Sequence, residues 1–398
     1  MVKGFQRYLK GDRYLWAFIG LLALFSFLPI YSASTNLTVN YGTGTVFSYL
    51  LKHALALFIG FIILFSTQFI DYKYFGGLSV LAMPLIFILL IITLTQRDHT
   101  EEGINTARWL HIPATSLSFQ TSTVAGMTLF IYCARYLAKN KDQSISFMES
   151  FWLLIFPVLV IIMLIFPANG STAALIFGWV AILLFLGGYP LKYLLILLLI
   201  GLSLTGIFIF IALRWGEQLP GNRVHIWKSR IENFSNSSGE ESYQVKRAKT
   251  AIVLGGQLGR GPGKSALKAF LPQSSSDFIY AIIVEEYGLA GGLTLLFLYV
   301  LILLRIVIIA TKVESYFGSL LVLSVGLPII GQALINMGVA VHLLPVTGQT
   351  LPLISAGSTS IWISCLSFGI ILSVSRSIQK NDLLAQDFQN SRIREEIA

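Results

Sequence analysis

The chain has 398 residues, of which 55% are hydrophobic and only 12% are charged. About a quarter of the residues in soluble domains are charged, so this composition excludes a soluble globular protein. The two cysteines, Cys133 and Cys365, lie inside apolar runs, so we expect no disulfide framework.

Apolar runs of about 20 residues recur along the chain, and each is long enough to cross a bilayer as an α-helix. They predict an all-α polytopic membrane protein with about ten transmembrane helices, forming a single integral membrane domain over residues 1–398. The first run follows several basic residues and has no small-residue cleavage site, so we expect an anchor. The predicted spans are residues 14–33, 48–69, 75–95, 118–137, 150–168, 171–189, 191–213, 288–310, 316–341 and 358–376.

The basic residues of the short loops predict the orientation of these spans. The N-terminus, the turn around Lys139 and the tail that follows Arg376 are basic, whereas the loops at 34–47 and 342–357 carry no charge. Both termini are therefore predicted to lie in the cytoplasm, and the hydrophilic stretch 380–398 is predicted to be a flexible cytoplasmic tail.

The long loop between the seventh and eighth spans, residues 214–276, is predicted to lie outside. It carries ten basic and four acidic residues, a net charge of +6 out of the chain's +9. Two interpretations stay open: the loop rests on anionic lipid headgroups, or it attracts a phosphorylated substrate. Its glycine-dense segment 255–265 is either a backbone nest for anions or a flexible connection, and it is neither a P-loop nor a dinucleotide-binding fingerprint.

Asp277 ends this loop, where the chain re-enters an apolar run. A carboxylate at a membrane boundary among cations suits proton transfer or metal binding, whereas the simpler interpretation is a helix N-cap. The apolar run also contains Glu285 and Glu286. Acids at membrane depth usually face a cavity or a partner, so Glu286 either supports a site or bonds a neighbouring helix end.

Two other outer segments carry polar residues in an irregular sequence. Residues 343–360 contain two prolines, two glycines and several hydroxyl groups, including Thr347 and Ser355. Irregular backbone near membrane depth is tolerated where protein or water satisfies it, so this segment either lines a cavity or forms a re-entrant turn. The pair Arg108 and Trp109 suits an anchor at the membrane interface.

Taken together, these motifs resemble the SEDS family of bacterial shape, elongation, division and sporulation proteins. The matching elements occur in order along nearly the whole chain. They are Arg108-Trp109, Gln244 ahead of the glycine-rich segment 255–265, the segment 271–288 around Asp277, and the segment 345–355. The region 244–268 is more similar to the division branch of the family than to its elongation branch.

The resemblance implies a peptidoglycan glycosyltransferase that polymerises lipid II during cell division, at the outer face of the cytoplasmic membrane. Asp277 matches the family's essential aspartate and would be the catalytic general base, with inversion at the donor sugar and undecaprenyl pyrophosphate as leaving group. A divalent cation, Mg²⁺ or Mn²⁺, would assist at Asp277. The implied partners are a class B penicillin-binding protein (a transpeptidase) and divisome membrane proteins, and no nucleic acid.

The resemblance also suggests the residues that handle the substrate. The implied substrate-binding residues are Arg223, Lys268, Gly259, Gly261, Ser265, Arg108, Thr347 and Ser355, and the supporting residues are Glu286 and Gln244. Among these, Arg223 and Lys268 are the first candidates for contacts to the pyrophosphate, whose developing negative charge needs cations.

The chain departs from the family pattern in the fourth span. Thr123 and Gly126 replace an acid and a lysine that would lie one helical turn apart. Two interpretations stay open: the acid and the lysine formed a structural ion pair whose members were lost together, or their loss weakens the enzyme. Two other functions stay open. One is a lipid II flippase, with Gln332 and Asn336 either lining a path or bonding neighbouring helices, and the other is a non-catalytic division scaffold, which the loss of this pair favours.

Overall fold

The computed structural model describes residues 9–41, 45–100, 103–106, 108–111, 118–143, 145–215, 243–271 and 274–397. The helices are α2 (Arg13–Tyr41), α3 (Val46–Thr67), α4 (Lys73–Thr95), α5 (Thr121–Lys139), α6 (Phe147–Ser150), a π-helical turn (Phe151–Ile155), α7 (Phe156–Leu186), α8 (Leu191–Trp215), α10 (Tyr243–Gly255), a 3-10 turn (Leu267–Ala269), α11 (Ile279–Lys312), α12 (Tyr316–Ala340) and α13 (Ser358–Ile397). Two antiparallel pairs of short strands lie between α4 and α5: β1 (Arg97–Thr100) with β2 (Gly103–Thr106), and β3 (Leu110–His111) with β4 (Ser118–Phe119).

The described residues contain seven helices that are long and apolar enough to cross a membrane. One of them, Phe147–Leu186, is two spans, because Asn169 has non-helical backbone angles. The Ser150 Oγ atom lies 2.8 Å from the Tyr189 hydroxyl, whereas a straight helix would separate these residues by about 58 Å. The segment therefore folds back at Asn169. With α5 and α8 beside these spans, the predicted series of transmembrane helices is confirmed.

Local capping explains where several spans begin. Thr45 and Ser48 form a capping box at the start of α3, and the Ser315 side chain accepts a hydrogen bond from the Gly318 amide at the start of α12. The Leu15 amide donates to Asp12 Oδ1 at 2.8 Å ahead of α2. These side chains satisfy amides that have no partner within their own helix, so each helix starts at a defined residue.

A second break, at Gly288, divides α11. Gly288 has a φ of +70°, and a Cβ atom there would lie 2.3 Å from the Gln257 carbonyl oxygen. Only glycine allows both this backbone conformation and this approach of another segment. The membrane span therefore begins at Gly288, as the sequence predicted, and residues 279–287 form a separate short helix buried within the protein.

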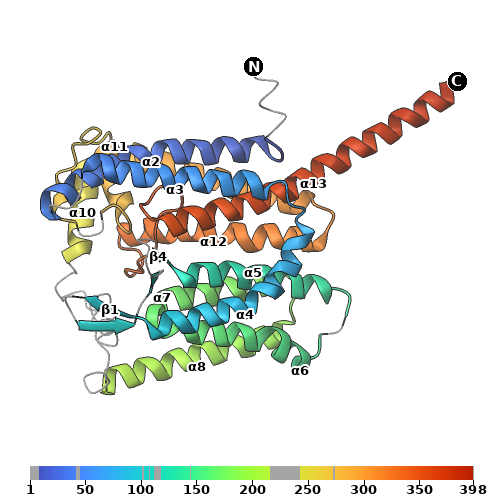
Figure 1. Ribbon diagram of the computed structural model, residues 1–398, viewed down its shortest axis with the longest axis horizontal. Helices are drawn as coiled ribbons and strands as arrows, with labels where there is room; N and C mark the ends of the chain where they lie inside the picture. The colour runs from blue at the N-terminus through green and yellow to red at the C-terminus, as the bar shows by residue number, and fades with distance from the viewer. Residues whose placement is uncertain are drawn as a thin grey trace.

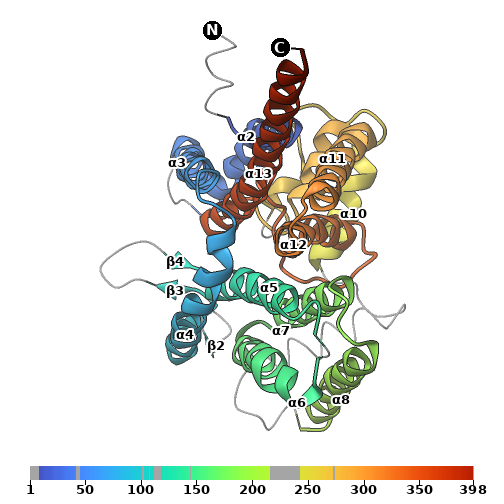
Figure 2. The ribbon, with the colours of Figure 1, turned by 90° about the vertical axis from the view of Figure 1, so that its right-hand side faces the viewer.

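The helices pack around two hydrophobic cores. The first core lies among α2, α3, α10, α11, α12 and α13. The second core lies among α4, α5, α7 and α8 and includes Leu320 of α12. Figure 2, which looks along the bundle, shows α5 and α7 facing α12 where the two halves meet. We call this boundary the seam; here Trp179 of α7 packs so closely on α12 that a Cβ on Gly331 would lie 1.7 Å from its ring.

The two ends of the bundle differ. The start of α2 and the middle of α13 meet at one end, where Gln379 Nε2 donates to the Gly11 carbonyl at 2.9 Å, and α13 then projects beyond the bundle (Figure 1). We call this the termini end. The opposite end, the site end, holds the strands, the segment 243–278 and the loop 342–357.

Part of the segment predicted as a basic loop is helical. Residues 243–255 form α10, whose Val245, Ala248, Ala251 and Gly255 are buried. Figure 1 shows that α10 runs across the site end of the bundle and not along it. The two free cysteines of the described chain are both buried, Cys133 in the second core and Cys365 in the first, as expected without a disulfide.

Candidate functional site

Two segments far apart in the sequence join at the site end: the turn at 274–278 and the loop 342–357. Ser355 Oγ donates to the Ser276 carbonyl at 2.6 Å, and the Ala356 amide donates to the Ser275 carbonyl at 2.8 Å. The Leu351 amide in turn donates to Ser355 Oγ at 2.7 Å. The predicted site residue Ser355 therefore fastens the loop to the turn that carries Asp277.

Asp277 lies in this turn, immediately before the short buried helix of α11. The N-cap position of that helix is Phe278, whose side chain makes no capping hydrogen bond. Asp277 is therefore one residue ahead of the N-cap position. The carboxylate lies against the loop 342–357, with Oδ2 3.5 Å from the position that a Cβ on Gly348 would occupy. Gly348 has a φ of +70°, so glycine lets the loop turn tightly beside the acid.

Asn336 of α12 bonds both the turn that carries Asp277 and the loop 342–357. Its Nδ2 donates to the Asp277 carbonyl at 2.8 Å and to the Gln349 carbonyl at 2.7 Å. Gln349 Nε2 continues the network to Thr172 Oγ1 at 3.1 Å, across the seam. The position of Asp277 is thus fixed by a side chain 59 residues later in the chain.

A cavity of about 110 Å³ lies between α5, α7, α12 and α13, and its lining includes Gly348, the residue against which the Asp277 carboxylate lies. Gly348 and Gln349 form part of its wall. Its polar lining consists of Gln120, Ser122, Thr123, Thr172, Gln332, Gln349, Thr350, Ser360, Ser364 and Ser367, and none of the described lining residues is charged. The cavity therefore offers neutral hydrogen-bonding groups, which suit hydroxyl and amide groups of a ligand.

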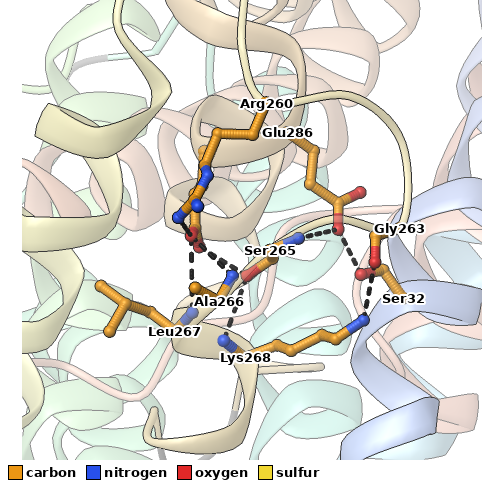
Figure 3. A network of polar contacts seen from close by, with 9 residues as sticks. Ser32, Arg260, Gly263, Ser265, Ala266, Leu267, Lys268 and Glu286 are labelled. Carbon is orange, nitrogen blue, oxygen red and sulfur yellow. Dashed lines mark hydrogen bonds and ion pairs between the residues drawn. The ribbon is translucent and has the colours of Figure 1, made fainter.

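Glu285 and Glu286 lie at the end of the short buried helix and organise the glycine-rich segment (Figure 3). The Glu285 carboxylate accepts hydrogen bonds from Ser265 Oγ and from the Ala266 amide at 2.8 Å. Arg260 Nη1 lies 3.6 Å from the same carboxylate. A buried acid is stable only when such donors surround it, so Glu285 fixes the chain at 260–267.

Glu286 connects the same segment to α2. Its Oε1 atom accepts hydrogen bonds from Ser32 Oγ and from the Ser265 amide. The second carboxylate oxygen, Oε2, is buried with no hydrogen-bond partner among the described residues. Ser265 donates hydrogen bonds from its hydroxyl to Glu285 and from its amide to Glu286. The predicted supporting residue Glu286 and the predicted binding residue Ser265, both labelled in Figure 3, therefore belong to one network.

The glycines of this segment allow backbone to pack on backbone. A Cβ on Gly259 would lie 2.2 Å from the Glu286 carbonyl oxygen, and one on Gly255 would lie 2.1 Å from the Val284 carbonyl oxygen. The amides of Gly259 and Gly261 donate to the carbonyls of Gly255 and Glu286. These two amides therefore already have backbone acceptors. Binding of an anion by Gly259 and Gly261 stays a prediction.

The remaining predicted residues lie at several places. Lys268 Nζ donates to the Gly263 carbonyl at 2.9 Å, within the glycine-rich segment. Arg108 Nε donates to the Ala168 carbonyl at 3.2 Å, beside the Asn169 turn. Thr347 adjoins Gly348, and its buried hydroxyl has no partner among the described residues. Gln244 is half-buried in the first turn of α10, and Arg223 lies outside the described residues.

The sequence left two roles open for Gln332 and Asn336, the lining of a transport path and hydrogen bonds to neighbouring helices, and it did not show their contacts to the loop 342–357. Gln332 Nε2 donates to Thr350, at 2.9 Å to its carbonyl and 3.0 Å to its hydroxyl. Asn336 holds Asp277, as described above. The available signal was two amide side chains, one helical turn apart, in an otherwise apolar span.

Comparisons with known proteins identify the family. The sequence pattern of the FtsW/RodA/SpoVE cell cycle proteins matches residues 12–380. The chain belongs to the FtsW/RodA/SpoVE family. The resemblance inferred from the motifs is thereby confirmed.

Relatives span almost the whole chain. A probable peptidoglycan glycosyltransferase FtsW of Saccharophagus degradans is 30% identical over 392 residues, which cover 96% of each protein. Stage V sporulation protein E of Bacillus subtilis is 29% identical and covers 89% of this chain and 94% of its own length.

Solved structures share the fold. The crystal structure of Thermus thermophilus rod shape determining protein RodA aligns with a TM-score of 0.65 and 22% identity, over 93% of this chain and 98% of that one. A chain of a peptidoglycan synthase complex, described for coordination of polymerization and crosslinking, aligns with a TM-score of 0.71 and 21% identity, over 93% and 99%.

Within this FtsW/RodA/SpoVE protein, the departures from the family pattern lie at the cavity. Thr123 and Gly126 both line it. A Cβ on Gly126 would lie 3.1 Å from Ile176 Cδ1, so Ile176 of α7 occupies the space where a larger side chain would begin. The cavity is therefore neutral at the two positions where the resemblance led us to expect an acid and a lysine.

Proposed function

We propose that this protein is a peptidoglycan glycosyltransferase that polymerises lipid II during cell division. The position of Asp277 carries the proposal. Asn336 holds its carbonyl, Ser355 holds the carbonyl of the preceding residue, and its carboxylate lies against Gly348, which lines a polar cavity. The FtsW relatives are named probable peptidoglycan glycosyltransferases, which supports the same reaction.

In the proposed reaction, Asp277 is the general base. It takes the proton from a sugar hydroxyl of the acceptor while that oxygen attacks the anomeric carbon of the donor sugar. The bond from that carbon to the pyrophosphate breaks, with inversion, and undecaprenyl pyrophosphate leaves with the electron pair. Removal of the proton by a positioned carboxylate contributes roughly 10²–10⁴-fold to such a reaction. The neutral hydroxyl and amide groups of the cavity would orient the sugars.

The leaving pyrophosphate needs positive charge. Arg260, whose side chain is 42% exposed, and Lys264, which is exposed, lie in the glycine-rich segment beside the predicted residue Lys268. Arg223 keeps its predicted role as a phosphate ligand. Fixed cations in a partly dehydrated site stabilise the charge that develops on the leaving group.

A divalent cation, Mg²⁺ or Mn²⁺, fits this site only together with the substrate. The described residues contain no cluster of three or more His, Cys, Asp or Glu side chains that would hold an ion by themselves. Mg²⁺ is often bound by one or two carboxylates and substrate phosphates, so Asp277 and the pyrophosphate would share it. Such an ion would supply a Lewis acid for the leaving phosphate.

We also infer the setting of the reaction. Basic residues in the short loops favour cytoplasmic termini, so the site end would face outward from the inner membrane. A class B penicillin-binding protein would cross-link the strands as they form, which agrees with the synthase complex that shares the fold. Divisome membrane proteins would be further partners.

The test is polymerisation by the purified protein, with and without the transpeptidase, given labelled lipid II and Mg²⁺ or Mn²⁺. We expect glycan strands from the wild type and none from Asp277→Asn, which keeps the shape of the side chain. Asp142→Asn, at an exposed position of the termini end, is the matched control and should polymerise normally. Absence of polymer from the wild type in both conditions would contradict the proposed activity. Normal polymer from Asp277→Asn would contradict only the role of that residue.

The same preparation tests the other two functions. A flippase would move lipid II across vesicles without forming polymer, and a scaffold would do neither. Gln332 and Asn336, the residues predicted to line a transport path, donate to Thr350, Gln349 and Asp277. Their donor groups thus hold the outer loop in place, which supports the glycosyltransferase over the flippase.

A further inference from the structure

The last turn of α10 and the residues after it expose a row of large apolar side chains. Val253 is 78% exposed, Leu254 is 44% exposed and Leu258 is 85% exposed. We call these three residues the apolar edge. The helix begins very differently, because Lys246, Arg247 and Lys249 lie in its first two turns. Helices that lie in a membrane interface combine basic side chains, which meet the headgroups, with exposed apolar side chains, which meet the acyl chains.

The apolar edge rests directly on the first turn of a membrane span. The Leu289 amide donates to the Gly256 carbonyl at 2.9 Å, and the Ala290 amide donates to the Gln257 carbonyl at 3.2 Å. Leu258 is the next residue along. The edge is therefore fixed at the depth where the span of α11 begins.

The exposed apolar surface continues from the edge down α11. Leu289, Leu293 and Phe297 are 51%, 52% and 59% exposed, and they repeat every four residues along one face of the helix. In a membrane span, such a face contacts lipid. The edge is thus continuous with the lipid-facing side of α11.

Length places this junction at the boundary of the hydrocarbon core. The span from Gly288 to Lys312 is about 37 Å long at 1.5 Å per residue, compared with a core of about 30 Å. Its first turn therefore lies near the level where acyl chains meet headgroups. Since α10 runs across the bundle end (Figure 1), it lies in the plane of that boundary.

We propose that the apolar edge inserts among the acyl chains of the leaflet at the site end, while the first turns of α10 lie among its anionic headgroups. The glycine-rich segment is then held at headgroup level by this anchor. The inference does not depend on the proposed enzymatic activity, because it follows from exposure and depth alone.

Spin labels on the full-length protein in nanodiscs of phosphatidylethanolamine and phosphatidylglycerol test this insertion. Both native cysteines are fully buried, so a new surface cysteine can be labelled selectively. The labels are placed at Val253→Cys and Leu258→Cys, with Leu293→Cys as the lipid reference and Asp142→Cys as the water reference. Collisions with oxygen, which concentrates in lipid, are compared with collisions with a water-soluble nickel chelate.

We expect oxygen-to-nickel collision ratios at Val253→Cys and Leu258→Cys that are raised above the ratio at Asp142→Cys and approach that at Leu293→Cys. Ratios equal to the water reference would overturn the proposal. Low collision rates with both reagents would also overturn it, because they would show that protein covers the edge.

A charge substitution gives a second readout. In the protein labelled at Val253→Cys, Leu258→Asp should lower the collision ratio toward the water reference, because a carboxylate resists entry into acyl chains. Gln257→Asp is the matched control: it adds the same charge at the preceding exposed position and should leave the ratio unchanged. An equal effect of the two substitutions would contradict insertion of Leu258.

Discussion

The two hydrophobic cores differ in the polar groups that they surround. In their most apolar stretches, α12 and α13 of the first core are 61% and 67% buried, whereas α3 and α11 of the same core are 33% buried and α4, beside the second core, is 22% buried. The first core surrounds Asp277, Glu285 and Glu286, whose backbone and side-chain groups are held by residues from distant elements. The second core is packed chiefly from apolar side chains and meets lipid on its outer side. Ionisable groups are thus placed where several segments converge and can supply hydrogen bonds.

The largest expected effect comes from the seam, where the two cores would be forced apart. In Gly331→Ala the new Cβ would lie 1.7 Å from the Trp179 ring, so α12 and α7 must separate. We expect a loss of about 3 kcal/mol or more in stability, at or beyond the usual cost of overpacking. Thermal unfolding in detergent measures it. Gly178→Ala is the control, because a Cβ there meets nothing within 4 Å, and an equal loss in both variants would refute close packing at the seam.

Gly259→Ala tests the first core alone. The new Cβ would lie 2.2 Å from the Glu286 carbonyl oxygen, and the residue has a φ of +80°. We expect a loss of about 2–3 kcal/mol, from backbone strain and displacement of the segment from α11. Polymerisation should fall as well. Gly263→Ala has the same kind of positive φ but meets nothing within 4 Å, so it should show only the smaller strain cost. Equal losses would show that the contact with α11 is unimportant.

Asn336→Leu separates positioning from stability. The variant leaves the carbonyls of Asp277 and Gln349 without their donor, so we expect a loss of about 2 kcal/mol and a fall in kcat greater than the change in KM. Ser150→Ala removes a hydrogen bond to Tyr189 in the second core and should cost about 1 kcal/mol with normal kcat. If both variants reduced kcat in proportion to their loss of stability, a specific positioning role of Asn336 would be contradicted.

The smallest effect concerns the neutral cavity. Thr123→Glu alone should destabilise the protein, because it places an unpaired carboxylate at the seam. Gly126→Lys one turn later crowds Ile176 and has a cost of its own, but pairing of the two charges should make the double variant about 1 kcal/mol more stable than the sum of the two single changes. A double-mutant cycle measured by thermal unfolding gives this coupling. Strict additivity of the two changes would show that the positions no longer form a pair.

The sequence predicted the spans well because the length of a continuous apolar segment determines whether it can cross a membrane as a helix. Even the start of the eighth span was found, since Gly288 ends a short apolar segment that also contains Glu285 and Glu286. The helix α10 was missed because its buried face consists mainly of small residues such as Ala248 and Ala251, between basic ones. Such a face gives little hydrophobic signal, and its burial depends on contact with α11.

The site was only partly predictable for a related reason. Asp277 and Ser355 were found by motif, but the sequence does not show that Asn336 donates to the Asp277 carbonyl. Likewise, a run of glycines suggested an anion nest, whereas Gly255 and Gly259 serve the close approach of two backbones. Hydrogen bonds between distant segments depend on tertiary packing and leave no local pattern.

The turn that carries Asp277 is held by later parts of the chain. During synthesis it can therefore reach its final position only after those parts have been made. Its hydrogen-bond donors from later segments include Asn336, Ser355 and the Ala356 amide, and Ser355 lies 79 residues after the carbonyl that it holds. At roughly 5–20 residues per second, the ribosome needs about 4–16 s to supply that stretch. The turn therefore acquires its final position only after α12 and the loop 342–357 have been made. A chain truncated before this loop would contain the aspartate but no assembled site.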